Sequence, residues 1–152
     1  MHDQFFDQII RDHGEIKTLL SEMLDSSNRS KRGELKNLFE AKFLPHMRAE
    51  EAVFYPALKE IRDSRNLALE AIEEHHAAEL ILNEVLNIRP QSEAWLPKCE
   101  VLKTLIEHHI SEEESQIFKV ARELISEEQA GKMLTNFAEE KMWYTGRITG
   151  EL

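Results

Sequence analysis

HMRAEEAVFYP, residues 46–56, decides the expected fold together with its near-copy HISEEESQIFK, residues 109–119. Each stretch opens with a histidine that is followed by a glutamate four residues later. In an α-helix this spacing brings both side chains to one face, one turn apart, where they can hold the same metal ion. The repeat therefore predicts two helices that direct ligands to a shared metal site. The pairs are His46 with Glu50 and His109 with Glu113.

The composition favours a small helical protein with an acidic surface. At 152 residues the chain is long enough for one domain with its own core, and we expect a single domain over residues 1–152. Only 5 glycines and 4 prolines leave few turns, which favours few and long elements. The formal net charge of −10 argues against nucleic acid as a partner and against an anionic membrane surface.

The expected location is the cytoplasm. No apolar run approaches the ~18–20 residues that a bilayer-spanning helix needs. The N-terminal residues MHDQFFDQIIRDH lack the basic and then apolar segments of a signal peptide. Cys99 is the single cysteine, so no intrachain disulfide can form, which fits a reducing compartment.

Helical periodicity runs through almost the whole chain, and no convincing alternation typical of strands interrupts it. We therefore expect an all-α fold, an antiparallel up-down four-helix bundle with an additional short C-terminal helix. Pro45 and Pro56 should kink or interrupt the second helix, because each lacks a backbone donor. The expected ranges are 3–124 for the bundle (helices at 3–25, about 31–61, 66–86 and 93–124), 127–144 for the extra helix and 145–152 for a loose tail.

Helical phase separates histidines that face the core from those that face solvent. His13 lies on a stripe with Ile9 and Ile16, and His46 follows Phe43 by three residues on another stripe. Each HH doublet places one ring inward and rotates the other by about 100° toward the polar side. We choose His75 and His109 as the inward-facing residues. Two alternatives stay open: His76 in place of His75, and His108 with Glu112 in place of His109 with Glu113.

These choices give one histidine on each of four helices, together with two glutamates. Burying so many ionisable groups without a metal would cost several kcal/mol for each unpaired charge. Four nitrogens and two oxygens are too many ligands for one tetrahedral zinc ion, whereas imidazole with carboxylate suits iron or manganese. If both glutamates bridge, the set serves two ions, each with two terminal histidines and open positions. The predicted ligands are His13, His46, Glu50, His75, His109 and Glu113.

Two other interpretations compete with this one. A ferritin-like di-iron site needs Glu-x-x-His on two helices and a lone Glu on each of the others. Only Glu73 and His76 have that spacing here, so the ferritin-like pattern is incomplete. The second is a structural or interaction bundle without metal, in which the histidines are hydrogen-bonded core groups.

Four pieces of the chain resemble the hemerythrin-like family, whose members are also called HHE cation-binding domains. The resemblance implies a four-helix bundle with two non-haem iron ions, for which Mn or Zn could substitute, bridged by two carboxylates. It also implies the six ligands named above and a small ligand such as O2, nitric oxide or peroxide. The pieces are Asp12-His13, HMRAEEAVFYP, EEHHAAELIL and HHISEEESQIF, spread over residues 12–118.

The chain also departs from the oxygen-carrying members of that family. They have a second histidine one turn after the third-helix ligand, where this chain has Glu79, and an Asp five residues after the last His, whereas Glu113 follows His109 by four. The resemblance is thus to a broader His/Glu branch, and it favours sensing, scavenging or iron storage and donation over oxygen carriage. An enzyme that reduces peroxide or nitric oxide at the same site is the alternative. Three questions stay open. They are whether Glu79 is an extra ligand, whether Tyr55 and Trp143 lie near the centre, and whether the last helix caps the bundle or forms a homodimer.

Overall fold

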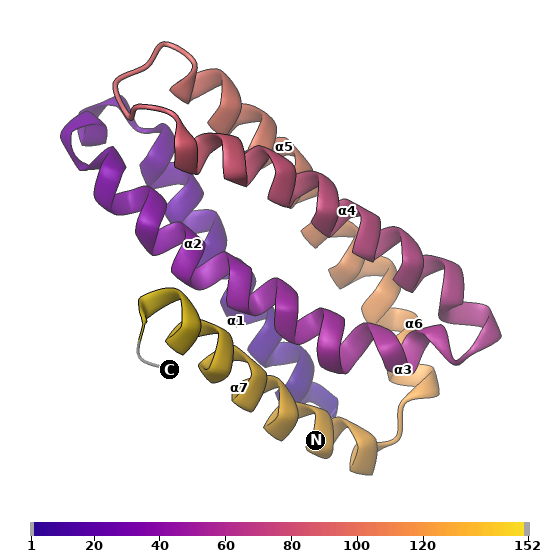
Figure 1. Cartoon of the computed structure of the whole chain (residues 1–152). Coiled ribbons are helices and arrows are strands. Elements are labelled where there is room, and N and C mark those ends of the chain that lie inside the picture. Colours follow the sequence, from indigo (N-terminus) through magenta and orange to yellow (C-terminus); the bar gives the residue numbers. More distant parts are fainter. Residues whose placement is uncertain (1, 151–152) are drawn as a thin grey trace.

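The computed structural model describes residues 2–150, which are helical nearly throughout and contain no strand (Figure 1). The prediction of an all-α fold is confirmed. None of the helices in this range has an apolar stretch long enough to cross a membrane. The α-helices are α1 (His2–Leu24), α2 (Arg32–Ala49), α3 (Tyr55–Lys59), α4 (Arg62–Asn87), α5 (Trp95–Glu112), α6 (Phe118–Leu124) and α7 (Glu127–Thr149), with a 3-10 helix η1 (Ser26–Lys31) and π-helical turns η2 (Glu50–Phe54) and η3 (Glu113–Ile117).

The long helices pack side by side: α1 lies against α2 and α5, and α4 against α5 (Figure 1). Polar contacts join distant parts of the chain at the end of this assembly that lies far from α3 and α6. The indole Nε1 of Trp95 donates a hydrogen bond to the carbonyl of Met23 at 2.9 Å. Arg32 donates to the carbonyl of Pro90 at 3.0 Å and lies over the Trp95 ring. These contacts fix the connection between α4 and α5 against the start of α2.

A π-helical turn begins at the glutamate of each of the two His-x-x-x-Glu pairs. The Tyr55 amide donates to the carbonyl of Glu50, and the Phe118 amide donates to the carbonyl of Glu113. Such turns close a longer ring than α-helical turns and occur often at functional sites. Here each turn brings the residue five positions after the glutamate, Tyr55 or Phe118, into the core.

The expected second helix is interrupted next to Pro56 but not at Pro45. Pro56 is the second residue of α3, just after η2, where its missing N–H and its ring oppose a regular α-helical turn. By contrast, α2 continues through Pro45, which is buried among the packed residues of that helix. Its tertiary packing therefore outweighs the loss of one intrahelical hydrogen bond.

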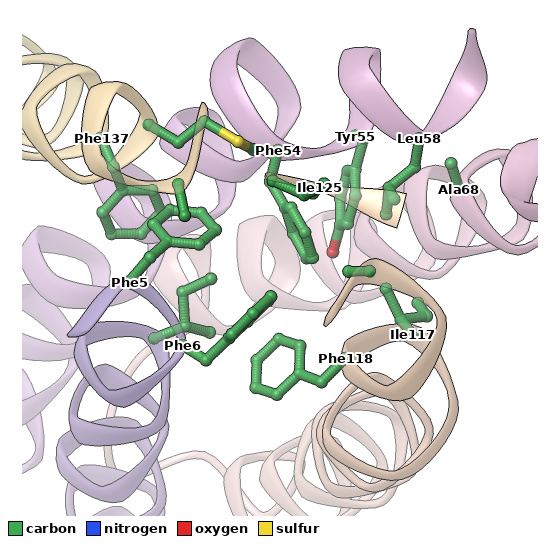
Figure 2. Packing of buried hydrophobic residues seen from close by; sticks show 14 of the residues in the cluster. Phe5, Phe6, Phe54, Tyr55, Leu58, Ala68, Ile117, Phe118, Ile125 and Phe137 are labelled. Atoms are coloured by element: carbon green, nitrogen blue, oxygen red, sulfur yellow. The ribbon is translucent and has the colours of Figure 1, made fainter. Parts of the chain in front are cut away.

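The apolar core is divided into two clusters. One contains the aromatic side chains of Figure 2, where Phe5 of α1 lies against Phe137 of α7 and Phe6 lies near Phe118. The other is built around Phe39 and Trp95 at the opposite end. Along α1, α2, α4 and α5, the predicted ligand histidine lies where the chain passes from one cluster to the other, as His13 does between Ile9 and Ile16.

The last helix is longer than expected. α7 spans 23 residues, so the prediction of a short helix ending at 144 with a loose tail from 145 is wrong for residues 145–149. The added turn is supported by Arg147, whose guanidinium lies 4.8 Å from the Trp143 ring centroid, and by Gly150, which ends the helix at φ 77°. Residues 151–152 lie outside the described range. In Figure 1 α7, coloured yellow, runs along α1 and α2.

Candidate metal centre

All six residues predicted as ligands are buried, and their side chains converge between the two apolar clusters. His13 comes from α1, His46 from α2, His75 from α4 and His109 from α5. The two glutamates are the first residues of the π-helical turns η2 and η3. The ligand candidates therefore come from four helices that lie far apart in sequence.

His13 and His46 form one histidine pair, with ring centroids 5.0 Å apart. The Nε2 atom of His46 lies 3.1 Å from Glu50 Oε1, and that of His13 lies 3.3 Å from Glu113 Oε1. One ligand atom from each of these four residues falls within 4.8 Å of all the others. Two nitrogens and two oxygens thus surround one point.

His75 and His109 form the second pair, with Nε2 atoms 3.1 Å apart. The Nε2 atom of His75 lies 3.3 Å from Glu50 Oε1, and that of His109 lies 3.5 Å from Glu113 Oε2. Each glutamate therefore contacts one histidine of each pair. A carboxylate between two pairs of imidazoles has the position of a bridging ligand.

Each of these four histidines also contacts a further carboxylate through its other ring nitrogen, Nδ1. The distances are 2.6 Å for His13 to Glu114, 2.9 Å for His46 to Asp12, 2.9 Å for His75 to Glu51 and 2.9 Å for His109 to Glu74. A donor contact of this kind fixes the tautomer and ring orientation of a metal-binding histidine and makes it more basic. All four Nε2 atoms are thereby left facing the centre.

The four outer carboxylates (Asp12, Glu51, Glu74 and Glu114) form a closed circuit around the helices. Each is the sequence neighbour of one ligand candidate but contacts the histidine of another helix. Asp12 of α1 contacts the histidine of α2, Glu51 of η2 that of α4, Glu74 of α4 that of α5, and Glu114 of η3 that of α1. Displacing any one helix would therefore disturb the centre.

Cations neutralise two of these outer carboxylates. Asp12 is fully buried, and Lys141 of α7 and Lys42 of α2 lie 2.8 and 3.2 Å from its oxygens. Arg48 lies 3.2 Å from Glu51. Burial alone would raise the pKa of Asp12, but the contacts with His46 and Lys141 hold it well below its usual range. The last helix thus supports the centre through Lys141.

The same carboxylates favour the charged forms of the histidines. Burial opposes protonation of His46, but the charge of Glu50 and the contact with Asp12 outweigh it and raise the pKa to about 9. Burial likewise opposes protonation of His109, but Glu113 and Glu74 raise its pKa to about 10. Without a metal, protons on these rings balance the carboxylates.

Tyr55 reaches the centre, whereas Trp143 does not. The Tyr55 hydroxyl donates a hydrogen bond to Glu113 and lies 3.2 Å from His75 Nε2 and 3.3 Å from His109 Nε2. Burial and the neighbouring charge of Glu113 raise its pKa well above the usual value, so the hydroxyl stays neutral. Trp143 is 45% exposed; its ring lies under the Arg147 guanidinium and meets the Tyr144 ring edge to face.

The alternative ligands lie outside this cluster. His76 is exposed and pairs with Glu73, and His108 is exposed near Glu112. Glu79 forms an ion pair with Arg48, so its carboxylate is already engaged. Helical phase thus predicts correctly which histidine of each HH doublet is buried and which is exposed.

Sequence reasoning assigned no role to the four outer carboxylates. Their contacts cross between helices, so helical periodicity within one segment cannot reveal them. A usable signal was present nonetheless, because every acidic neighbour concerned adjoins a ligand candidate. They occur in the doublets Asp12-His13, Glu50-Glu51, Glu74-His75 and Glu113-Glu114.

Several buried polar atoms of the centre make no hydrogen bond. They are both oxygens of Glu50, one oxygen of Glu113 and the Nε2 atoms of His13 and His46. A buried polar group without a partner costs about 1–3 kcal/mol, and more when it is charged. A cation in contact with both carboxylates and the imidazole nitrogens would satisfy all of them. The donor set therefore fits bound metal.

Comparison with known proteins points to the same chemistry. Residues 4–121 match the family model described as Hemerythrin HHE cation binding domain. A curated relative from Nostoc sp., named DNA nickase, is 25% identical over 145 residues. The alignment covers 95% of this chain and 41% of that relative, so the chain spans about two fifths of its length. No solved structure matches the chain.

Proposed function

Because this chain belongs to the hemerythrin HHE cation-binding family, we propose that its buried centre holds two non-haem iron ions. His13 and His46 would hold one ion, and His75 and His109 would hold the other. Glu50 and Glu113 would contribute to both, since each contacts one histidine of each pair. In this assignment α1, α2, α4 and α5 act as the four helices of an antiparallel bundle around the ions.

The observation that carries this proposal is the fully buried carboxylate of Glu50, both of whose oxygens lack a hydrogen bond. An ionised group in that position needs a compensating cation. His46 and His75 contact it from two sides through Nε2, the nitrogen that imidazole offers to a metal. With a structural role for the histidines alone, protonated rings would contact Oε1 only, and Oε2 of Glu50 would have no compensating charge.

The ligand types favour iron or manganese over structural zinc, and the family resemblance favours iron of the two. Imidazole and carboxylate suit Fe and Mn, whereas structural zinc sites prefer four tetrahedral ligands that often include cysteine. Cys99, the single cysteine, belongs to the apolar cluster at the other end of the core. Mn and Zn are therefore proposed only as substitutes. When bound, a ferrous pair supplies open coordination positions for O2, nitric oxide or peroxide, and electrons for their reduction.

The side chains around the ions orient the ligands and exclude water. The outer carboxylates accept the Nδ1 protons, which keeps each Nε2 lone pair turned to the centre. Tyr55 keeps its proton and directs it at Glu113. The apolar clusters on both sides separate the centre from solvent.

We propose sensing, scavenging, or storage and donation of iron as the role of this centre, in the cytoplasm. The engagement of Glu79 by Arg48 supports this choice over oxygen carriage, because Glu79 occupies the place of the fifth histidine of oxygen carriers. A binding or sensing protein should respond to its ligand with a single change and then stop.

The test is anaerobic loading with ferrous iron followed by optical titration with O2 and with nitric oxide. We expect one saturable spectral change for the ligand that binds, and no continued consumption of that ligand when an electron donor is added. Continued turnover would instead support an enzyme that reduces peroxide or nitric oxide. A metal-loaded protein that is no more stable to heat than the metal-free protein would contradict metal binding altogether.

A further inference from the structure

Glu74 of α4 faces two imidazoles at once. Its Oε1 accepts a hydrogen bond from His109 Nδ1 at 2.9 Å, and its Oε2 lies 3.5 Å from His108 Nε2. These two histidines are consecutive residues of α5, one buried in the centre and the other with its side chain 62% exposed. A single carboxylate thus connects the buried centre to the protein surface.

A third side chain completes a cluster on the surface. Glu112, one turn after His108 on α5, places Oε1 3.3 Å from His108 Nε2. One ligand atom each from Glu74, His108 and Glu112 lies within 4.8 Å of the other two. All three side chains are at least partly exposed, so an ion can reach them from solvent and complete its coordination with water.

The outer carboxylates differ in whether a lysine or an arginine pairs with them. Asp12 has ion pairs with Lys42 and Lys141, and Glu51 has one with Arg48. Among residues 2–150, Glu74 has no ion pair with a lysine or an arginine; its ion pairs are with His108 and His109. With Glu112 beside it, this side of the centre carries two carboxylates around one exposed imidazole, in a chain whose net charge is −10.

We propose that His108, Glu74 and Glu112 form a second, surface site for a divalent transition-metal ion, with Zn²⁺ as the probe. One imidazole and two carboxylates are ligands that zinc accepts, and three protein ligands leave a position for water. The site shares Glu74 with His109 of the buried centre. It does not depend on that centre being filled, so it can be tested separately from the proposed function.

The experiment is isothermal titration of Zn²⁺ into the purified, iron-loaded protein at neutral pH, with iron content measured afterwards. We expect one Zn²⁺ per chain to bind without loss of iron. The replacements His108→Ala and Glu112→Gln should each weaken this binding by about tenfold or more, since even loss of an outer partner of a ligand costs that much. The matched control is His76→Ala, an exposed histidine that contacts a single carboxylate, Glu73, and it should leave Zn²⁺ binding unchanged.

A further variant tests the shared carboxylate. Glu74→Ala should abolish the surface site and also lower the thermal midpoint, because His109 loses its partner, whereas Glu112→Gln should affect only Zn²⁺ binding. Unchanged Zn²⁺ affinity in His108→Ala would overturn the proposal, as would an equal loss in His76→Ala, which would indicate scattered weak binding. If the wild-type protein does not retain iron but His108→Ala still loses Zn²⁺ binding, the proposed function is contradicted and the surface site is not.

Discussion

Asp12 of α1 holds the imidazole of His46 on α2, with 2.9 Å between Oδ2 and Nδ1. The same carboxylate contacts Lys141 of α7 at 2.8 Å, so three helices meet at one buried acidic group. His46 is thereby fixed with its Nε2 atom 3.1 Å from Glu50. Equivalent contacts orient the other three histidines, and this relationship leads to the first prediction.

Replacing Asp12 with Ala should weaken metal binding by about 10–100-fold although every proposed ligand is still present, because the His46 ring loses its orienting partner. Asp12→Asn should recover part of the affinity, since an amide oxygen can still accept the Nδ1 proton. Iron retention under a graded chelator measures the effect. Asp7→Asn, an exposed position on the same helix, is the control. Equal retention in Asp12→Ala and wild type would show that the contact has no orienting role.

Loss of Glu113 should remove the second ion and the dinuclear optical spectrum, because this residue contacts a histidine of each pair. Glu107→Ala, an exposed position on α5 six residues earlier, should leave both unchanged. Anaerobic titration with ferrous iron, followed optically, compares the two variants. A dinuclear spectrum that survives in Glu113→Ala would show that this carboxylate does not bridge.

The metal-free protein should lose stability as pH rises above neutrality. The pKa values of His46 and His109 in the folded chain, about 9 and about 10, lie above the ordinary value of 6.5. The stability that their protonation contributes is therefore fully present below pH about 6.5 and is lost as pH rises through about 9–10. Metal replaces those protons, so the loaded protein should show a smaller decrease. Thermal midpoints between pH 6 and 10 measure both; a midpoint of the metal-free chain that rises over this range would contradict the assignment.

Tyr55→Phe should destabilise the metal-free protein by about 1–3 kcal/mol, because removing the hydroxyl leaves a buried oxygen of Glu113 without its donor. Tyr144→Phe is a suitable control, since that residue lies in α7 and packs on Trp143 away from the centre. Urea unfolding of both variants gives the comparison. Equal stabilities for Tyr55→Phe and wild type would mean that solvent satisfies Glu113 instead.

Helical phase alone was sufficient to predict that His13, His46, His75 and His109 are buried, because the apolar stripe of a helix faces the core. It could not predict Tyr55 beside Glu113, since that contact depends on a π-helical turn that shifts the phase after Glu50. Pro56 explains the turn in η2, but η3 contains the same turn without a proline.

Contacts between helices were also beyond the reach of the sequence. The outer carboxylates act on histidines of neighbouring helices, and their role appears only once the helices are placed side by side. The last helix also extends past the expected end at residue 144. In the structure Gly146 is buried, and the helix continues to Thr149.

The central claim is that the buried centre holds two ions, and counting them tests it most directly. The suitable protein is the His108→Ala chain, in which the proposed surface site cannot contribute, loaded anaerobically with ferrous iron and freed of excess metal. Native mass spectrometry of this protein should show two iron ions per folded chain. One or fewer after full reconstitution would contradict the dinuclear centre.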